Sequence, residues 1–507
     1  MLASVRSATL LGVDGQLVAV EVHVSNGLPA YNVVGLPDAS GRESRERVRA
    51  ALLSSELEWP MRRITVNLAP GGFRKTGSGL ELAVATGVLL AIGELPQGCL
   101  DDVGVLGELG LDGSVRAVPG TLALVHALRR AGCERVVVPA ANAREASLVA
   151  GTEVLPVRTL PELRACLKGE LAWPSPDDVS PPRRPSSHAP LGIDAEAEAL
   201  DLADVRGLSE VRRALEIAAA GGHHLLLVGP PGVGKTMVAR RIVTVLPELL
   251  PEEALDVTRV HSVVGEAPDG VLITRPPWRA PHHTASSAAI VGGGSVRARP
   301  GEITMANLGT LFMDELGEFA PAVLDALRQP LEERVVRISR QSSTLTFPAD
   351  FLLIACSNPC PCGRPVTDCT CDPARLARYR RRLSAPLLDR FELRMGVTRP
   401  DADEAPGDPS SVVRARVSRA VKRQRARYDG LPWRRNAALP AGRLHDLAPL
   451  DADAFDAWRE IVRRRELTGR GAITVRRVAR TVADLAGADD IEPAHLLMAE
   501  SLRQDVP

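Results

Sequence analysis

The sequence Gly229-Pro-Pro-Gly-Val-Gly-Lys-Thr236 decides the central part of this fold, because an apolar run precedes it and a helix-like segment at 235–246 follows it. It fits the pattern G-x-x-x-x-G-K-[ST], in which glycines turn backbone N–H groups toward phosphate oxygens and the helix adds partial positive charge. Lys235 is expected to bridge β- and γ-phosphates, and the Thr236 hydroxyl to bind Mg²⁺. The alternative is an ordinary glycine-rich turn. The residues expected to cradle the phosphates are Gly229, Pro230, Pro231, Gly232, Val233, Gly234, Lys235 and Thr236.

Two carboxylates and an amide follow later apolar runs. Asp314 and Glu315 follow the run at 311–313, and the next apolar run, at 351–355, ends at Ser357-Asn358. Asp314 is expected to hold Mg²⁺ through water and Glu315 to polarise the attacking water, two tasks that hydrolysis of a phosphoanhydride requires. Asn358 could orient that water. An acidic pair after a strand is usually a solvated turn, and Asn before Pro is common in turns; the P-loop upstream favours the functional interpretation.

The order of elements around the P-loop predicts an α/β unit with a parallel sheet. Strand-like runs at 223–229, 309–315 and 351–358 alternate with helix-like segments at 235–246 and 321–333. These runs lack the two-residue alternation of half-exposed strands, as expected for a parallel sheet covered on both faces.

The flanking regions have different patterns. Before the linker, apolar runs at 18–24, 64–68 and 136–138 mix with helix-like segments at 44–56 and 79–92, which predicts a mixed α/β domain. The end of the chain is expected to be helical. Its apolar residues at helix spacing are Val475, Val478, Ala479, Val482 and Leu485.

Two segments rich in proline and charge divide the chain. We expect a first domain at 1–171, a Pro/Ser-rich linker at 172–200, a central unit at 201–397, a second linker at 398–410 and a helical domain at 411–507. A chain of 507 residues is long enough for three such domains.

Composition excludes several classes of protein. Lys+Arg and Asp+Glu are 62 each, so the net charge is zero and does not indicate a nucleic-acid or membrane partner. Any such partner must be inferred from local clusters of charge. Aromatics at 3% argue against base stacking as the main mode of nucleic-acid binding. The first residues lack the pattern of a secretory signal, and the longest apolar run is too short for a membrane helix. We therefore expect a cytoplasmic protein.

Four of the eight cysteines form a compact cluster in the sequence, Cys360, Cys362, Cys369 and Cys371. Their thiolates could bind one tetrahedral Zn²⁺, although C-x-C spacing is less typical than C-x₂-C. Reduced buried thiols and a labile disulfide are the alternatives. His282 and His283 are poor candidates for further ligands, because adjacent residues on a strand point to opposite faces.

Basic residues gather in three places that could contact DNA phosphates. Residues 412–435 carry nine basic side chains against one acid, which fits phosphate neutralisation as well as it fits a solvated helix face. The other two are the glycine-rich segment 291–301 with Arg297 and Arg299, and the segment 334–346 with Arg337 and Arg340.

Several motifs together resemble the YifB/ComM family of magnesium-chelatase-like AAA+ ATPases. They are GPPGVGKT at 229–236, RAPHHTASSAAIVGGGS at 279–295, RPGEITMANLGTLFMDEL at 299–316, SNPCPCG at 357–363 and YRRRLSAPLLDRF at 379–391. The resemblance implies an AAA+ core with pore hairpins at 291–301 and 334–346, a helical lid, homohexameric rings on DNA, and ATP-driven branch migration in recombination and natural transformation.

The resemblance also implies roles for single residues. Lys235 and Thr236 match Walker A, Asp314 and Glu315 match Walker B, and Asn358 matches sensor 1. Arg390 matches the finger that acts on a neighbouring protomer, and Arg476 or Arg477 matches sensor 2.

The first domain resembles the Lon protease catalytic domain (ribosomal protein S5 domain 2-like), through residues 71–85 and 105–118. The Ser-Lys dyad of that family would fall at Gly79 and Arg116, and arginine cannot serve as the base. We therefore expect a binding or assembly module rather than a peptidase.

Three functions fit these observations. The first is a Mg²⁺-dependent ATPase ring that moves DNA strands, with DNA, further copies of the chain and recombination proteins as partners. The second is a magnesium-chelatase-type motor for metal insertion. The third is a scaffold whose partner binding is gated by ATP.

Overall fold

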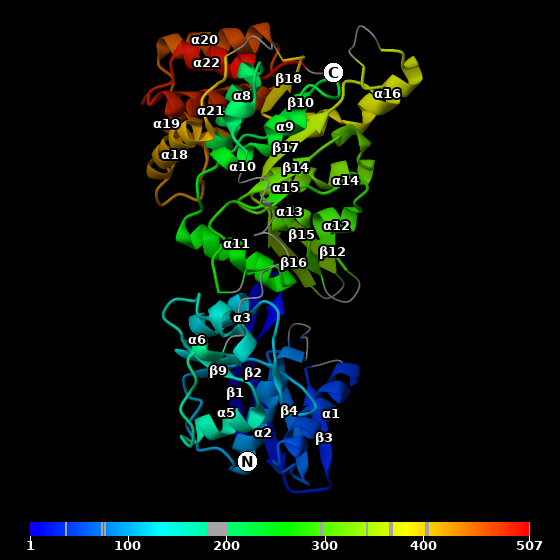
Figure 1. Cartoon of the computed structure of the whole chain (residues 1–507), viewed down its shortest axis with the longest axis vertical. Coiled ribbons are helices and arrows are strands. Elements are labelled where there is room, and N and C mark those ends of the chain that lie inside the picture. The colour runs from blue at the N-terminus through cyan, green and yellow to red at the C-terminus, as the bar shows by residue number, and fades with distance from the viewer. Residues whose placement is uncertain are drawn as a thin grey trace. The chain divides into compact units, whose positions relative to one another are not determined.

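The computed structural model describes residues 1–35, 38–71, 75, 78–179, 200–268, 270–294, 298–340, 343–364, 369–400 and 405–505. They form two compact units (Figure 1). The first holds the described residues of 1–187 together with 251–273 and 337–347, and the second holds those of 188–250, 274–336 and 348–507. Most of the expected 172–200 linker lies outside the described residues, as do 401–404 of the second linker.

A seven-stranded sheet organises the first unit, in the order β3-β4-β2-β1-β5-β8-β9. Its strands are β1 (Leu2–Leu11), β2 (Asp14–Ser25), β3 (Ala30–Val34), β4 (Arg63–Ala69), β5 (Val103–Val105), β8 (Arg135–Pro139) and β9 (Glu153–Val157). Strand β2 runs antiparallel to β1 and β4, and the remaining pairs are parallel. A short hairpin joins β6 (Glu108–Leu109) to β7 (Val115–Arg116). The mixed α/β prediction is confirmed, including strands over the three predicted runs.

Helices complete this unit, and α2 is the most buried of them. The helices are α1 (Asp38–Ser54), α2 (Glu81–Ile92), α3 (Thr121–Arg130), α4 (Ala143–Ala146), α5 (Leu160–Leu167), α6 (Pro176–Val179) and α11 (Pro251–Val264). All residues of α2 except Ile92 are buried. Gly87 allows α2 to lie close to the sheet, because a Cβ at this position would meet a methyl carbon of Val22 at 2.6 Å.

A five-stranded parallel sheet organises the second unit, in the order β11-β14-β17-β10-β18. Its strands are β11 (Trp278–Arg279), β14 (Thr310–Met313), β17 (Leu352–Ser357), β10 (Leu225–Val228) and β18 (Leu393–Gly396). Every residue of β10, β14 and β17 is buried. The predicted parallel sheet covered on both faces is therefore confirmed.

The helices around this sheet are α8 (Ser209–Gly221), α9 (Lys235–Arg240), α10 (Ile242–Val245), α12 (Ser287–Val291), α13 (Glu302–Met305), α14 (Pro321–Ala326), α15 (Arg328–Glu333), α16 (Pro373–Arg382) and α17 (Ala385–Leu388). The helix expected at 321–333 is divided at Leu327, where Pro330 has no N–H to donate to Ala326. The helix expected at 235–246 is divided at Arg241, whose carbonyl accepts from the Thr244 hydroxyl at 2.7 Å.

The C-terminal part is helical, as predicted. It contains α18 (Ser410–Arg427), α19 (Leu444–Leu447), α20 (Ala452–Arg464), α21 (Gly469–Ala486) and α22 (Pro493–Ser501). The apolar face of α21 buries Val475, Val478, Ala479 and Val482 in a core shared with α8 and β10. Across the described ranges, we find no helix with both the length and the apolar character needed to span a bilayer.

Candidate nucleotide-binding site

The register of three neighbouring strands brings the predicted site residues together. Val228 of β10 pairs with Ser357 of β17, and Met313 of β14 pairs with Ala355. The segments that follow these strands therefore meet at the carboxyl edge of the sheet, where α/β proteins bind ligands. They enclose a cleft of about 380 Å³. Its lining residues are Pro231, Gly232, Gly234, Lys235, Thr236, Met237, Asp314, Glu315, Cys356, Ser357 and Asn358.

Two glycines shape the loop before α9. Gly232 has φ +80° and Gly234 has φ +94°, a left-handed conformation that residues with a side chain adopt at a cost. Lys235 follows, and its ammonium donates to the carbonyls of Gly229 at 2.6 Å and Pro230 at 2.8 Å, and to Asn358 Oδ1 at 3.2 Å. Burial lowers the pKa of Lys235. A phosphate in the cleft would supply the negative charge that this buried ammonium lacks.

Thr236 and Asp314 form the second part of the site. The Thr236 hydroxyl donates to Asp314 Oδ2 at 2.9 Å, and Asp314 Oδ1 accepts from the backbone N–H of Glu315 at 3.0 Å. A hydroxyl and a carboxylate are oxygen ligands of the kind that Mg²⁺ prefers. These two residues therefore fit the metal that the sequence predicts.

Glu315 has an exposed side chain and a left-handed backbone, with φ +53°. Non-glycine residues in this conformation are uncommon and often belong to functional sites. Glu315 Oε2 lies 3.5 Å from Nδ1 of His283, a contact that sequence reasoning missed. The expectation that His282 and His283 point to opposite faces is wrong, because they lie in a loop and their ring centroids are 4.1 Å apart.

Tyr379 is a second residue that sequence reasoning missed. Its hydroxyl donates to the backbone carbonyl of Asn358 at 3.1 Å and lies 3.3 Å from Ser357 Oγ. The ring is buried, so α16 braces the end of β17 from outside the cleft. The motif at 379–391 contained this tyrosine, but its contact depends on the tertiary fold.

The three predicted arginines do not line the cleft of their own protomer. Arg390 donates to Glu332 and to the Pro386 carbonyl. Arg476 donates to the carbonyls of Ala448 and Leu444, and Arg477 to that of Leu439. The arrangement does not choose between Arg476 and Arg477, and the roles of all three arginines stay predictions.

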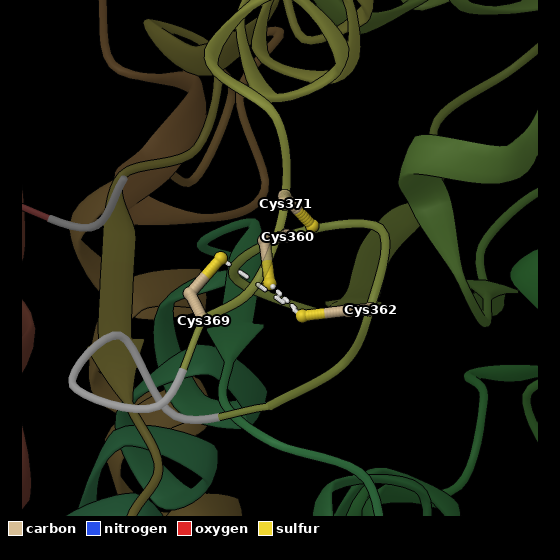
Figure 2. Close-up of side chains that lie close together, drawn as sticks. All are labelled: Cys360, Cys362, Cys369 and Cys371. Atoms are coloured by element: carbon tan, nitrogen blue, oxygen red, sulfur yellow. Dashed lines mark hydrogen bonds between the residues drawn. The ribbon is translucent and has the colours of Figure 1, made fainter.

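The four clustered cysteines converge near the same end of β17 (Figure 2). The four sulfurs all lie within 4.8 Å of one another, and they belong to Cys360, Cys362, Cys369 and Cys371. Cys362 Sγ lies 3.2 Å from Cys360 Sγ and 3.9 Å from Cys369 Sγ. Burial raises the pKa of Cys360, whereas backbone N–H groups, first that of Arg364, lower the pKa of Cys362 to about 6.

The basic segment at 412–435 uses several of its arginines to hold the fold together. Arg416 binds Glu216 and Asp408, each at 2.6 Å, and Arg427 donates to Asp484. Arg414 donates to the Thr244 carbonyl at 2.7 Å. These contacts favour a structural role for this segment over phosphate binding.

The glycine-rich segment at 291–301 and the segment at 334–346 each form a hairpin. Gly292–Gly293 (β12) pairs with Arg299–Pro300 (β13), and β15 (Val335–Arg340) forms a two-stranded sheet with β16 (Ser343–Pro348). Arg299 is exposed, whereas Arg297 lies outside the described residues.

The parallel sheet, the glycine loop and the carboxylate pair define a P-loop nucleotide hydrolase of the AAA+ class. Comparison with known families agrees with this class. Residues 201–405 match the family described as magnesium chelatase, subunit ChlI, residues 20–142 match subunit ChlI of Mg-chelatase, and residues 407–503 match the C-terminal part of that subunit.

Relatives match over nearly the whole chain. An uncharacterized protein of Mycobacterium tuberculosis is 42% identical over 98% of both chains. YifB of Escherichia coli K12 is 38% identical and competence protein ComM of Haemophilus influenzae is 37% identical, each over 99% of this chain and 97% of the relative. The chain belongs to the YifB/ComM family of magnesium-chelatase-like AAA+ ATPases.

A weaker likeness concerns the Lon-like part of the prediction. An archaeal Lon protease of Methanocaldococcus jannaschii is 23% identical over 142 residues, which is 28% of this chain and 21% of the protease. The fold class predicted from the sequence, an AAA+ core with a Lon-like domain and a helical C-terminal part, is therefore confirmed.

Proposed function

We propose that this protein is a Mg²⁺-dependent ATP-hydrolysing ring motor that acts on DNA in the cytoplasm and promotes branch migration during recombination or natural transformation. The observation that carries the proposal is the convergence of Lys235, Thr236, Asp314, Glu315 and Asn358 on one cleft at the carboxyl edge of the sheet. Full-length likeness to a competence protein supports the biological setting.

The cleft has the groups that hydrolysis of a phosphoanhydride needs. Lys235 would neutralise the β- and γ-phosphates, and Thr236 with Asp314 would hold Mg²⁺, which when bound screens the charge that develops on the phosphate oxygens. Glu315 is exposed at the end of β14 and would polarise the attacking water. Asn358, held through its carbonyl by Tyr379, would orient that water.

The lack of an arginine in the described lining of the cleft supports a ring. No arginine is among its described lining residues, and Lys235 is the cation that faces it. Phosphoryl transfer by P-loop enzymes commonly uses an arginine supplied from a neighbouring chain. We propose that Arg390 of an adjacent protomer fills this role in a homohexamer, and that Arg476 or Arg477 acts as sensor 2.

DNA binding is assigned to the hairpins rather than to residues 412–435. A hairpin with exposed Arg299 can contact a phosphate backbone without reading bases, which suits a translocating motor. We propose that β12–β13 and β15–β16 line the DNA path, and that the Lon-like domain is a non-proteolytic binding module.

A chelatase-type motor is the second candidate, because three family descriptions that match this chain name magnesium chelatase. One experiment separates the two. We would measure ATP hydrolysis by the full-length protein with no DNA, with single strands, with duplex and with a four-way junction. The proposal expects the junction to give the largest stimulation, together with strand exchange that requires ATP. Equal hydrolysis in all four samples would reject a DNA motor and favour the chelatase-like function.

A further inference from the structure

The four cysteine sulfurs lie about as close together as the sulfurs of a four-thiolate zinc site. Zinc bound by four thiolates has Zn–S distances of about 2.3 Å, which places neighbouring sulfurs about 3.8 Å apart. The two Sγ–Sγ distances from Cys362 are 3.2 Å to Cys360 and 3.9 Å to Cys369, and all four sulfurs fit within 4.8 Å. In Figure 2 the four sulfurs point toward a common centre. A zinc ion there would need only small side-chain movements.

The alternatives explain this arrangement less well. All four cysteines are free thiols in this structure, so the cluster is not held together by disulfides. Four thiols gathered for packing alone would be expected in an apolar core, yet Cys362, Cys369 and Cys371 are only partly buried. Within the described part of the chain, the group contains cysteines alone, a donor set that selects a thiophilic metal over Mg²⁺.

The cluster is connected to both halves of the nucleotide cleft. Cys360 lies two residues after Asn358, so its position constrains the end of β17. The turn after it lies against the P-loop, since a Cβ on Gly363 would be 3.2 Å from the Pro231 ring. On the far side, Cys371 leads into α16, whose Tyr379 donates to the Asn358 carbonyl.

We propose that the four thiolates bind one zinc ion, and that the zinc-bound loop holds Asn358 and the P-loop in the conformation that binds nucleotide. The zinc is a clamp and takes no part in the reaction. Its binding is independent of the proposed function, whereas its effect on the cleft rests on the cleft binding ATP.

The metal is tested first, in full-length protein purified under reducing conditions without chelator. Plasma mass spectrometry should find about one zinc per chain. Cys362→Ser and Cys369→Ser should each lower this content at least fivefold, whereas Cys99→Ser, a partly buried cysteine outside the cluster, should leave it unchanged. Protein that stays free of zinc after incubation with a zinc salt, or that contains a bond between two of the four cysteines, would overturn the proposal.

The clamp is tested by nucleotide affinity. Wild-type protein stripped of zinc and returned to excess Mg²⁺ should bind a fluorescent ATP analogue at least fivefold more weakly, and added zinc should restore the affinity. Circular dichroism checks that the stripped protein stays folded, and Cys362→Ser gives a second measurement without chelator. Equal affinity with and without zinc would overturn the clamp.

Lys235→Ala separates the two hypotheses. Because Lys235 lies in the cleft and not in the cluster, this variant should keep its zinc while losing nucleotide affinity. If zinc-loaded wild-type protein bound no ATP analogue, the proposed function would fail while the metal site stood. If it bound the analogue but contained no zinc, only the metal proposal would fail.

Discussion

The Thr236 hydroxyl donates a hydrogen bond to Asp314 Oδ2 across 2.9 Å, although 78 positions separate the two residues in sequence. Thr236 is the second residue of α9 and Asp314 directly follows β14, so the contact exists only because the parallel sheet brings these segments to one edge. Without a metal, the hydroxyl and the carboxylate serve as hydrogen-bond partners for each other. When Mg²⁺ is bound, the Thr236 hydroxyl and the Asp314 carboxylate would hold it in the cleft.

Asp314→Asn should therefore raise the Mg²⁺ concentration needed for half-maximal ATP hydrolysis by roughly tenfold or more. The amide keeps an oxygen near Thr236 but loses the charge that attracts a divalent cation. Titration of Mg²⁺ at fixed ATP measures this. Asp325→Asn, on α14 and paired with Arg328, is the matched control and should leave the requirement unchanged. A normal Mg²⁺ requirement in Asp314→Asn would remove this residue from the metal site.

Glu315→Gln should bind ATP with near-normal affinity and hydrolyse it about 100-fold or more slowly, because a general base contributes factors of that size. The side chain is exposed and contacts His283, and glutamine keeps its size, so nucleotide binding should change little. Single-turnover hydrolysis and an equilibrium binding assay measure the two quantities separately.

Glu318→Gln is the control for that experiment. Glu318 lies three residues further on and contacts Arg382 at 3.3 Å, outside the cleft lining. Equal slowing in both variants would show that loss of charge in this region, and not a specific role of Glu315, lowers the rate.

Tyr379→Phe should lower kcat by roughly two- to tenfold with little change in ATP affinity. The substitution removes one neutral hydrogen bond, worth about 0.5–1.5 kcal/mol, and keeps the buried ring in place. Its target is the carbonyl of Asn358, so the expected defect is in orienting water rather than in binding. Steady-state kinetics test this, and a raised KM with unchanged kcat would contradict it.

The sequence predicted those parts of the site that follow single strands. Runs such as Leu225–Val228 and Leu352–Ser357 are buried along their whole length, and their composition shows it. The residues that follow them were therefore predictable. His283 and Tyr379 were not, because they reach the site from a loop and a helix whose approach is set by tertiary packing.

Arginine was the residue type whose role was hardest to predict. Of the 62 basic residues four are lysines, so most arginines carry little information by themselves. Arg416 and Arg427 lie in a segment that could have bound DNA, yet both make intramolecular ion pairs. Their partners, Glu216 on α8 and Asp484 on α21, are distant in sequence. No local sequence pattern predicts these ion pairs.

The buried Glu81 of the first unit makes the stability of the fold depend on pH. Burial raises the pKa of Glu81 to about 7 from an ordinary value of 4.5, against the opposing effects of the Leu109 N–H at 3.0 Å and of Arg47. Between these two values the folded chain holds this proton more tightly than the unfolded chain. The contribution of Glu81 to the free energy of unfolding is therefore fully present at low pH. It falls as the pH rises from 4.5 to about 7, and it stays constant at higher pH.

Glu81→Gln should remove this dependence, because an amide does not titrate and can still accept the Leu109 N–H. The thermal unfolding temperature of the variant minus that of wild type should therefore increase from pH 5 to pH 8. Calorimetry of both full-length proteins across this range measures the difference. Glu58→Gln, at an exposed position, should track wild type at every pH. If the Glu81→Gln and wild-type curves stayed parallel, the carboxyl would have to be ionised in the folded protein throughout.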